Sequence, residues 1–117
     1  MDLDQVRTYC LKKNNVTETL PFDEDTPVYK VGGKMFCLAN LNPPIFINLK
    51  CDPEKAVELR EKYEEVQPGY HMNKMHWNSV YLVSNIPDKI VYGWIDDSYN
   101  LTVTKLPKVQ KEKLGKK

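Results

Sequence analysis

Two adjacent glycines between two apolar stretches constrain this chain more than any other feature of its sequence. Gly32 and Gly33 separate residues 28–31 from residues 34–39, and both runs are rich in strand-forming side chains. A two-residue turn between strands requires positive φ angles, which glycine adopts without a steric penalty. The pattern therefore predicts a β-hairpin with its tip at Gly32-Gly33.

Three further segments predict strands. Residues 16–22 are β-branched, and Pro21 makes them an edge strand or the end of a strand. Isoleucine and leucine alternate with other side chains over residues 45–49, and residues 77–83 are again rich in strand formers. Together with the hairpin, these segments predict a sheet of about five to six strands.

Two segments before the middle of the chain predict helices. Residues 3–13 carry an apolar stripe at helical spacing, and Asp2 is placed to cap this helix at its N-terminus. Asp52 and Pro53 are typical N-cap and first-turn residues of a second helix. We expect the second helix to continue until residues 67–69, where a Gln-Pro-Gly sequence stops it.

A third helix is predicted to begin at Pro87 and Asp88. Its apolar stripe consists of Ile90, Val91, Trp94 and Ile95. Ser98 either ends this helix or caps a further short one. We expect Trp94 and Ile95 to be buried against the sheet, because this stripe is the only one on the last regular helix.

The order of these segments predicts the fold class. Helices grouped at the ends of hairpin-linked strands are typical of an α+β domain with a largely antiparallel sheet. The 117 residues fit one compact domain, and 41% apolar with 28% charged residues is a globular composition. We expect a single α+β domain over residues 1–106, whose sheet is interrupted by one helix and followed by a C-terminal helix or helix pair. A basic tail occupies residues 107–117.

The sequence also bears on location and redox state. No apolar run approaches the roughly 20 residues that span a bilayer, and the N-terminus lacks the basic and apolar regions of a secretory signal. A cytoplasmic protein without membrane contact is expected. Cys10, Cys37 and Cys51 have no C-x-x-C spacing, so we expect reduced thiols, with Cys10 as a small buried residue.

Common catalytic and cofactor signatures are missing from the sequence. It contains no glycine-rich phosphate or dinucleotide loop and no zinc-protease or serine-hydrolase motif, so we expect neither an enzyme nor a cofactor. The two histidines, His71 and His76, are five residues apart. Ordinary hydrogen bonding is the favoured interpretation of this pair over metal ligation, because a metal site would need a distant third ligand.

Positive charge is unevenly distributed, although the formal net charge is only +1. Six lysines and one glutamate follow residue 104, whereas residues 1–104 hold eleven basic and fifteen acidic residues. Such a basic tail contacts phosphates or simply stays solvated. A second basic set, in the sheet region, is the candidate nucleic-acid site: Lys30, Lys34, Lys50, His71, Lys74 and His76.

Lysines next to aromatic residues suit nucleic acid, because ammonium groups displace counterions from phosphates and exposed rings stack on bases. One geometrical point opposes this hypothesis. In a two-residue hairpin Val31 faces Lys34, and strand alternation then places Lys30 and Lys34 on opposite faces of the sheet, so that they converge only at the tip. Trp77, moreover, is more often a core residue than a stacking platform.

A resemblance to a known family supports the nucleic-acid hypothesis. Six ordered motifs resemble the MmcQ/YjbR family, from the first helix to Tyr99. They are Pro21-Phe22, Lys30-Val31-Gly32-Gly33-Lys34-Met35-Phe36, Leu49-Lys50-Cys51-Asp52-Pro53, Pro68-Gly69-Tyr70-His71-Met72-Asn73-Lys74, His76-Trp77 and Ser98-Tyr99. The resemblance implies a CyaY/frataxin-like α+β fold and a DNA-binding role through a double wing, meaning two hairpins of the sheet.

The first wing would be the Gly32-Gly33 hairpin, and the second would lie within residues 70–77. The resemblance implies no catalytic residues. Frataxins are associated with iron and an acidic first helix, but here the first helix offers only Asp2 and Asp4 beside basic residues. A shared fold does not carry a shared function, so iron binding is not expected.

The leading hypothesis is a small, monomeric, non-catalytic protein that binds DNA through phosphates. Sequence-specific recognition is not expected, because no helix carries the Arg, Asn or Gln cluster that reads base edges. The alternative is a protein-interaction module that uses the same basic and aromatic surface. A small-molecule-binding or enzymatic domain comes third.

Overall fold

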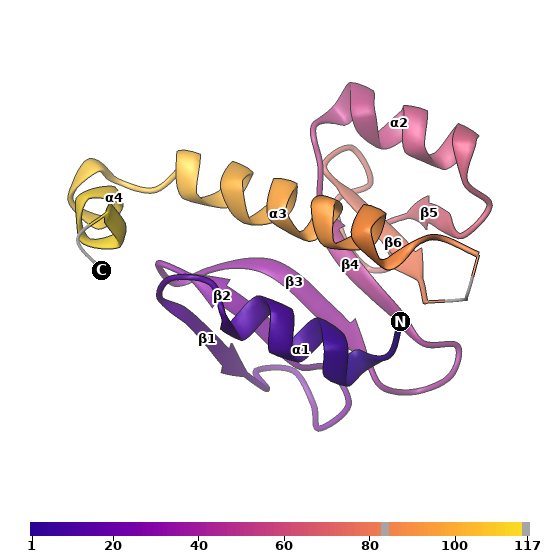
Figure 1. The fold of residues 1–117 in the computed structure, drawn as a ribbon, viewed down its shortest axis with the longest axis horizontal. Helices are drawn as coiled ribbons and strands as arrows, with labels where there is room; N and C mark the ends of the chain where they lie inside the picture. Colours follow the sequence, from indigo (N-terminus) through magenta and orange to yellow (C-terminus); the bar gives the residue numbers. More distant parts are fainter. Residues whose placement is uncertain (83–84, 116–117) are drawn as a thin grey trace.

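The computed structural model describes residues 1–82 and 85–115, with side chains up to residue 112. Helices and strands follow one another in the order α1 (Leu3–Leu11), β1 (Val16–Thr19), β2 (Val28–Val31), β3 (Lys34–Asn40), β4 (Phe46–Lys50), α2 (Pro53–Lys62), β5 (Val66–Pro68), β6 (Trp77–Tyr81), α3 (Asp88–Thr104) and α4 (Lys108–Gly115). This order confirms the expected α+β domain (Figure 1).

The six strands form one fully antiparallel sheet in the order β1-β2-β3-β4-β6-β5. The predicted hairpin is confirmed: Val31 pairs with Lys34, and Gly32 and Gly33 take φ angles of 58° and 78°. The register shifts between Tyr29 and Lys30, which leaves one extra residue in β3. The first strand lies at the sheet edge, as Pro21 predicted.

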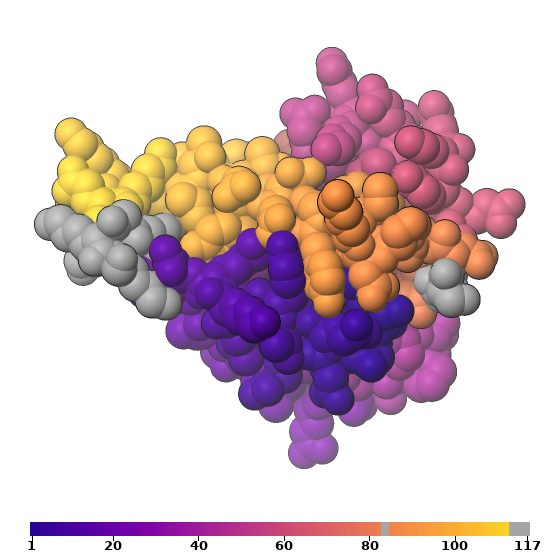
Figure 2. Space-filling view, in the orientation of Figure 1, coloured from indigo at the N-terminus to yellow at the C-terminus, as the bar shows by residue number. Residues whose placement is uncertain are grey.

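One face of the sheet packs against the helices. Val6 and Cys10 of α1 and Trp94 and Ile95 of α3 join the inward side chains of the strands in the main hydrophobic core. The two helices lie side by side across this face (Figures 1 and 2). The aromatic rings of Tyr9 and Tyr92 stack between them, with centroids 4.1 Å apart.

Among the described residues, no helix covers the opposite face of the sheet. A second, smaller cluster of buried side chains lies here, formed by Val28, Leu38 and Trp77 with Met35 and Met72 packed against it. Trp77 is 7% exposed, which confirms its expected place in a core rather than on the surface. We call this side the open face.

The N-terminal cap of α1 and most of the buried stripe of α3 agree with the predictions from the sequence. The side chain of Asp2 accepts a hydrogen bond from the Gln5 backbone at 2.8 Å and forms a capping box at the start of α1. Trp94 and Ile95 are buried as predicted, but Ile90 is wrong as a member of the stripe because it is 38% exposed. Two buried hydroxyl residues extend the stripe instead, Ser98 and Thr102.

Several details of the helices and strands differ from the prediction. The second helix ends at Lys62, and a short strand, β5, occupies Val66–Pro68, where helix continuation was expected. Burial of Val66 against Val80 stabilises this strand, and its position at the sheet edge tolerates Pro68. Asp52 stands at the N-cap of α2 without a side-chain capping bond. The third helix continues through Ser98.

The C-terminal region treated as a basic tail contains helix α4 over Lys108–Gly115. Helix α4 begins two residues after Leu106, which is buried against Gly32 of the hairpin tip. Val83, which the sequence assigned to a strand, and Lys116 and Lys117 of the tail lie outside the described residues. In the part of the chain that the structure describes, no helix is long and apolar enough to cross a membrane.

Candidate functional site

The register of the sheet brings its two candidate wings to the same end. Lys34 begins β3 beside the hairpin tip, and Lys50 ends β4 opposite Trp77 at the start of β6. The connection between β5 and β6, residues 69–76, therefore leaves the sheet at the end where the Gly32-Gly33 tip lies. Both hairpins named by the double-wing hypothesis thus share one end of the sheet.

A third lysine reaches this end from the helix layer. Lys105 is the C-cap residue of α3, and Leu106 beside it contacts Gly32. We call Lys34, Lys50 and Lys105 the lysine edge. They come from β3, β4 and α3, and only the folded chain brings them together.

Mutual repulsion among these ammonium groups is visible in their electrostatics. Partial burial lowers the pKa of Lys50, and the positive charges of Lys105 and Lys34 lower the pKa further. The Lys50 Nζ lies 5.8 Å from the centroid of the Trp77 ring, so the ring face also neighbours this charge. A phosphate placed between these lysines would relieve their repulsion.

The three lysines of the lysine edge lack carboxylate partners among the described residues, unlike three other basic side chains. Arg7 pairs with Glu18, Lys13 with Asp96 and Lys55 with Asp97. Within residues 1–82 and 85–112, none of the three edge lysines lies within ion-pair distance of a carboxylate. Their charge is therefore available to an external anion.

The remaining sequence-predicted basic residues lie around this edge without joining it. Lys30 pairs with Met35 on the open face, whereas Lys34 shares the register position of Val31, a helix-face residue. The expected placement of Lys30 and Lys34 on opposite faces of the sheet is therefore confirmed. Lys74 is exposed in the β5–β6 connection, where its Nζ donates a hydrogen bond to the carbonyl of Gly69 at 3.1 Å.

Neither of the two histidines belongs to the lysine edge, and the two lie in different surroundings. His76 is half-buried immediately before β6. His71 is exposed with a φ angle of 58°, and its ring contacts that of Tyr70 at a centroid distance of 4.0 Å. His71 faces a second feature, a groove on the open face.

This groove has a volume of about 380 Å³ and crosses strands β3 and β4. Its floor includes Leu38 and Phe46, and its two banks are loops. Phe22 and Asp23 line it from the β1–β2 loop, and Tyr70, His71 and Met72 line it from the β5–β6 connection. We call it the open-face groove.

A buried polar pair fixes one bank of the groove. Asn48 donates to the carbonyl of Tyr70 at 3.2 Å, and Ser79 accepts from the Tyr70 N–H at 2.9 Å. The Ser79 hydroxyl also donates to the side-chain oxygen of Asn48, and both side chains are buried. The Tyr70 backbone is therefore tied at both polar groups to the middle of the sheet.

The described residues give little support for a nucleophilic or a metal-binding site. Cys10, Cys37 and Cys51 are free and buried, as expected. The neighbouring Cys10 thiol and burial hold the pKa of Cys37 well above its usual value, which keeps it in the unreactive thiol form. In the described part of the chain, no three His, Cys, Asp or Glu side chains come together in a way that could hold a metal ion.

Sequence reasoning missed the open-face groove, and it also missed Lys105, Asn48 and Ser79. Lys105 was counted with the tail, and nothing in its local sequence connects it with β3 and β4. Asn48 and Ser79 had a detectable signal, because each is a polar residue inside an apolar strand. Such residues are buried only with hydrogen-bond partners, so they indicate a polar contact across the sheet.

The chain matches the YjbR family model over residues 11–101. It belongs to the YjbR family. The match confirms the resemblance to MmcQ/YjbR proteins that the sequence motifs indicated. It ends within α3, so Lys105 and α4 lie beyond the matched residues.

Two curated relatives from Escherichia coli share this family resemblance. The chain is 45% identical to YbdF of strain O157:H7 over 89 residues, which cover 75% of this chain and 73% of YbdF. It is 34% identical to YjbR of strain K12 over 116 residues, with 97% of both chains covered. Both relatives are uncharacterized proteins.

Solved structures of similar proteins have the same fold. The crystal structure of the Deinococcus radiodurans protein DR2400 has a TM-score of 0.90 and 35% identity, over 97% of this YjbR-family chain and 87% of its own. A crystal structure from Pseudomonas syringae has a TM-score of 0.77 and 29% identity, over 87% of this chain and 99% of its own. This chain therefore shares its α+β architecture with these solved structures.

Proposed function

We propose that this YjbR-family protein binds duplex DNA without catalysis and without sequence preference, through phosphate contacts of the lysine edge. The proposal rests on one observation: Lys34, Lys50 and Lys105 gather at the end of the sheet where both wings lie, without carboxylate partners among the described residues. Ammonium groups in such a cluster release counterions when they contact phosphates.

The arrangement supports non-specific binding better than base recognition. Lysine presents a point charge, and it lacks the planar fork by which arginine reads guanine or holds a phosphate with two bonds. Arg7 lies on α1, and the guanidinium of Arg60 on α2 donates a hydrogen bond to the carbonyl of Lys74 in the β5–β6 connection at 3.3 Å. We place this activity in the cytoplasm and assign it to the monomer.

A fluorescence anisotropy titration with a labelled duplex over a range of salt concentrations tests the proposal. Contact with about three phosphates gives a slope of log K against log salt of about −3. Lys34→Ala and Lys105→Ala should each weaken binding to every duplex alike and reduce the magnitude of the slope by about one. Absence of salt-dependent binding by the full chain would leave the protein-interaction alternative as the better hypothesis.

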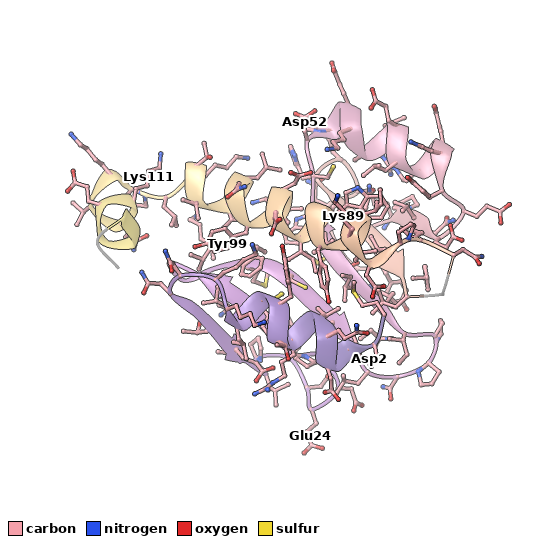
Figure 3. All side chains as sticks on the ribbon, viewed as in Figure 1. Asp2, Glu24, Asp52, Lys89, Tyr99 and Lys111 are labelled. Carbon is pink, nitrogen blue, oxygen red and sulfur yellow. The ribbon has the colours of Figure 1, made fainter. Side chains whose placement is uncertain are left out.

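Lys89→Ala is the matched control, because it removes one exposed lysine from the first turn of α3 (Figure 3). This position is about 24 Å along the helix from Lys105. Its loss should leave both the affinity and the slope nearly unchanged. If Lys89→Ala weakens binding as much as Lys105→Ala, general charge rather than the lysine edge explains the affinity.

A second arm separates the lysine edge from α4. The double substitution Lys108→Ala/Lys111→Ala removes two exposed lysines from this helix, one of which points into solvent in Figure 3. If this variant alone abolishes binding while Lys34→Ala has no effect, α4 carries the interaction and the wings do not.

A further inference from the structure

The open-face groove combines aromatic rings with one carboxylate, and its chemistry differs from that of the lysine edge. Phe22 is 63% exposed and Tyr70 is 54% exposed, and the two rings belong to opposite banks. Phe46 lies between them in the floor and contacts Tyr70 at a centroid distance of 5.9 Å. Exposed rings around a concavity of about 380 Å³ form a surface of the size that small ligands occupy.

The charge beside the groove is negative. Asp23 is the one acidic residue among the described residues that line it. Glu24 and Asp25 follow it in the same loop, and none of these three carboxylates has an ion-pair partner among the described residues. Phosphates and carboxylates are repelled from such a mouth, whereas cations are attracted.

The same chain already holds one ammonium group with this combination of groups. The Lys13 Nζ lies 4.9 Å from the ring centroid of Tyr9 and 5.1 Å from that of Tyr99, and it forms an ion pair with Asp96. Two aromatic rings and one carboxylate therefore surround an ammonium group in this fold. Tyr70, Phe22 and Asp23 offer the groove the same types of group.

We propose that the open-face groove binds a small organic ammonium compound, with its apolar body against the aromatic rings and its charged nitrogen beside Asp23. The ring faces carry negative potential and attract the cation, and the carboxylate adds a direct charge interaction. The clamp of Asn48 and Ser79 on Tyr70 keeps one bank in place without a ligand, so little ordering is needed on binding. This site is independent of the proposed DNA contact.

Three probes that share one phenyl ring and differ in head group test the proposal on the full chain. They are 2-phenylethylammonium, the neutral 2-phenylethanol and the anionic 3-phenylpropionate. In titrations of ¹⁵N-labelled protein followed by NMR, the ammonium probe should shift the backbone amides of Asn48, Tyr70 and Met72 saturably. The alcohol should bind more weakly and the carboxylate weakest of the three.

Two substitutions in one loop distinguish a local contact from general charge. Asp23→Asn and Glu24→Gln each remove one negative charge, but only Asp23 lines the groove, and Glu24 projects from the loop tip in Figure 3. Asp23→Asn should raise the dissociation constant of the ammonium probe about two- to fivefold and leave that of the alcohol unchanged. Glu24→Gln should change neither constant. Phe22→Ala should weaken all probes, because it removes an exposed ring that they share.

Three results would overturn the proposal. They are an alcohol that binds as tightly as the ammonium probe, an equal effect of Asp23→Asn and Glu24→Gln, and the absence of saturable shifts at the groove with 2-phenylethylammonium. The lysine-edge variant Lys34→Ala should bind the ammonium probe normally. Failure of DNA binding and failure of the groove site are therefore separate outcomes.

Discussion

The hydroxyl of Ser98 on α3 accepts a hydrogen bond from the backbone N–H of Lys50 on β4 at 2.8 Å. The same hydroxyl donates to the carbonyl of Phe36 on β3, so one helix side chain bridges two neighbouring strands. The pairing of β3 with β4 stops at Cys37 and Leu49, immediately before this point. Ser98 thus satisfies two backbone groups where the strand ladder ends, next to the lysine edge.

Ser98→Ala should destabilise the protein by about 1–3 kcal/mol, because it leaves a buried N–H and a buried carbonyl without their partner. Urea unfolding followed by circular dichroism measures this change. Thr104→Ala is the control, since its exposed hydroxyl also bonds to a backbone carbonyl, that of Asn100, but no strand depends on it. The control should remain within about 0.5 kcal/mol of the parent protein. Equal losses in the free energy of unfolding for the two variants would show that the Ser98 bridge does not stabilise the protein more than an exposed hydroxyl does.

Trp94→Ala should cost about 3–5 kcal/mol, since it empties a large buried site beneath α2 and α3. The Trp94 ring contacts Tyr63 edge to face at a centroid distance of 5.2 Å, so that contact is lost as well. Ile90→Ala on the same helix should cost much less, because Ile90 is exposed. A urea midpoint for Trp94→Ala close to that of Ile90→Ala would contradict the assignment of Trp94 to the core.

Local sequence signals predicted those parts of the fold that depend on neighbouring residues. Gly32-Gly33 placed the hairpin tip, Asp2 placed the start of α1, and the spacing of Val91, Trp94 and Ile95 placed the buried face of α3. In each case the physical requirement, a positive φ, an unpaired N–H or an apolar stripe, lies within a few residues of its solution.

Local sequence patterns could not predict contacts between distant segments of the chain. Strand β5 has three residues and contains Pro68, and it exists because Val66 pairs with Val80 on a strand that follows later. Ser98 is polar and was interpreted as the end of α3 or the cap of a further helix, yet two strands in front of it supply its hydrogen-bond partners. A buried hydroxyl in a helix is explained only by what the helix packs against.

The candidate sites also combine features that the local sequence predicts with contacts between distant segments that it does not predict. The sequence predicted Lys34 and Lys50 as part of a basic set, but their association with Lys105 depends on where α3 ends above the hairpin. The open-face groove was not predicted, because its banks come from loops around residues 22 and 70. Loops far apart in sequence are brought together only by the strand order of the sheet.

Substitution of the two turn glycines should have unequal effects. Alanine at either position strains a positive φ, at a cost of about 1–2 kcal/mol. At Gly32 the new methyl group would also lie 2.8 Å from the side chain of Leu106, whereas at Gly33 it would meet open space. Urea unfolding should therefore show a larger loss for Gly32→Ala than for Gly33→Ala. Equal losses in the free energy of unfolding would mean that the Leu106 side chain moves aside without cost and that its contact with the hairpin tip is loose.

Alkaline pH should destabilise the protein through two tyrosines. Burial and a hydrogen bond to Glu18 raise the pKa of Tyr29 far above its ordinary value of 10, and burial and a hydrogen bond to Asp96 raise the pKa of Tyr9 to about 12. Above pH 10 the unfolded chain releases these protons while the folded chain keeps them, so the free energy of unfolding falls as pH rises from 10 toward 12.

Tyr29→Phe isolates the contribution of the more deeply buried of these two groups. The variant loses the hydrogen bond to Glu18, which retains its ion pair with Arg7 at 3.0 Å, so at neutral pH it should be less stable by about 1 kcal/mol. Its unfolding free energy should then decline less steeply than that of the parent above pH 10, because one proton-releasing group of the unfolded state is missing. Urea titrations at pH 8, 10 and 11 measure both slopes. Parallel curves for the two proteins would contradict this prediction. They would mean that Tyr29 ionises equally in the folded and unfolded states, despite its burial beneath α1.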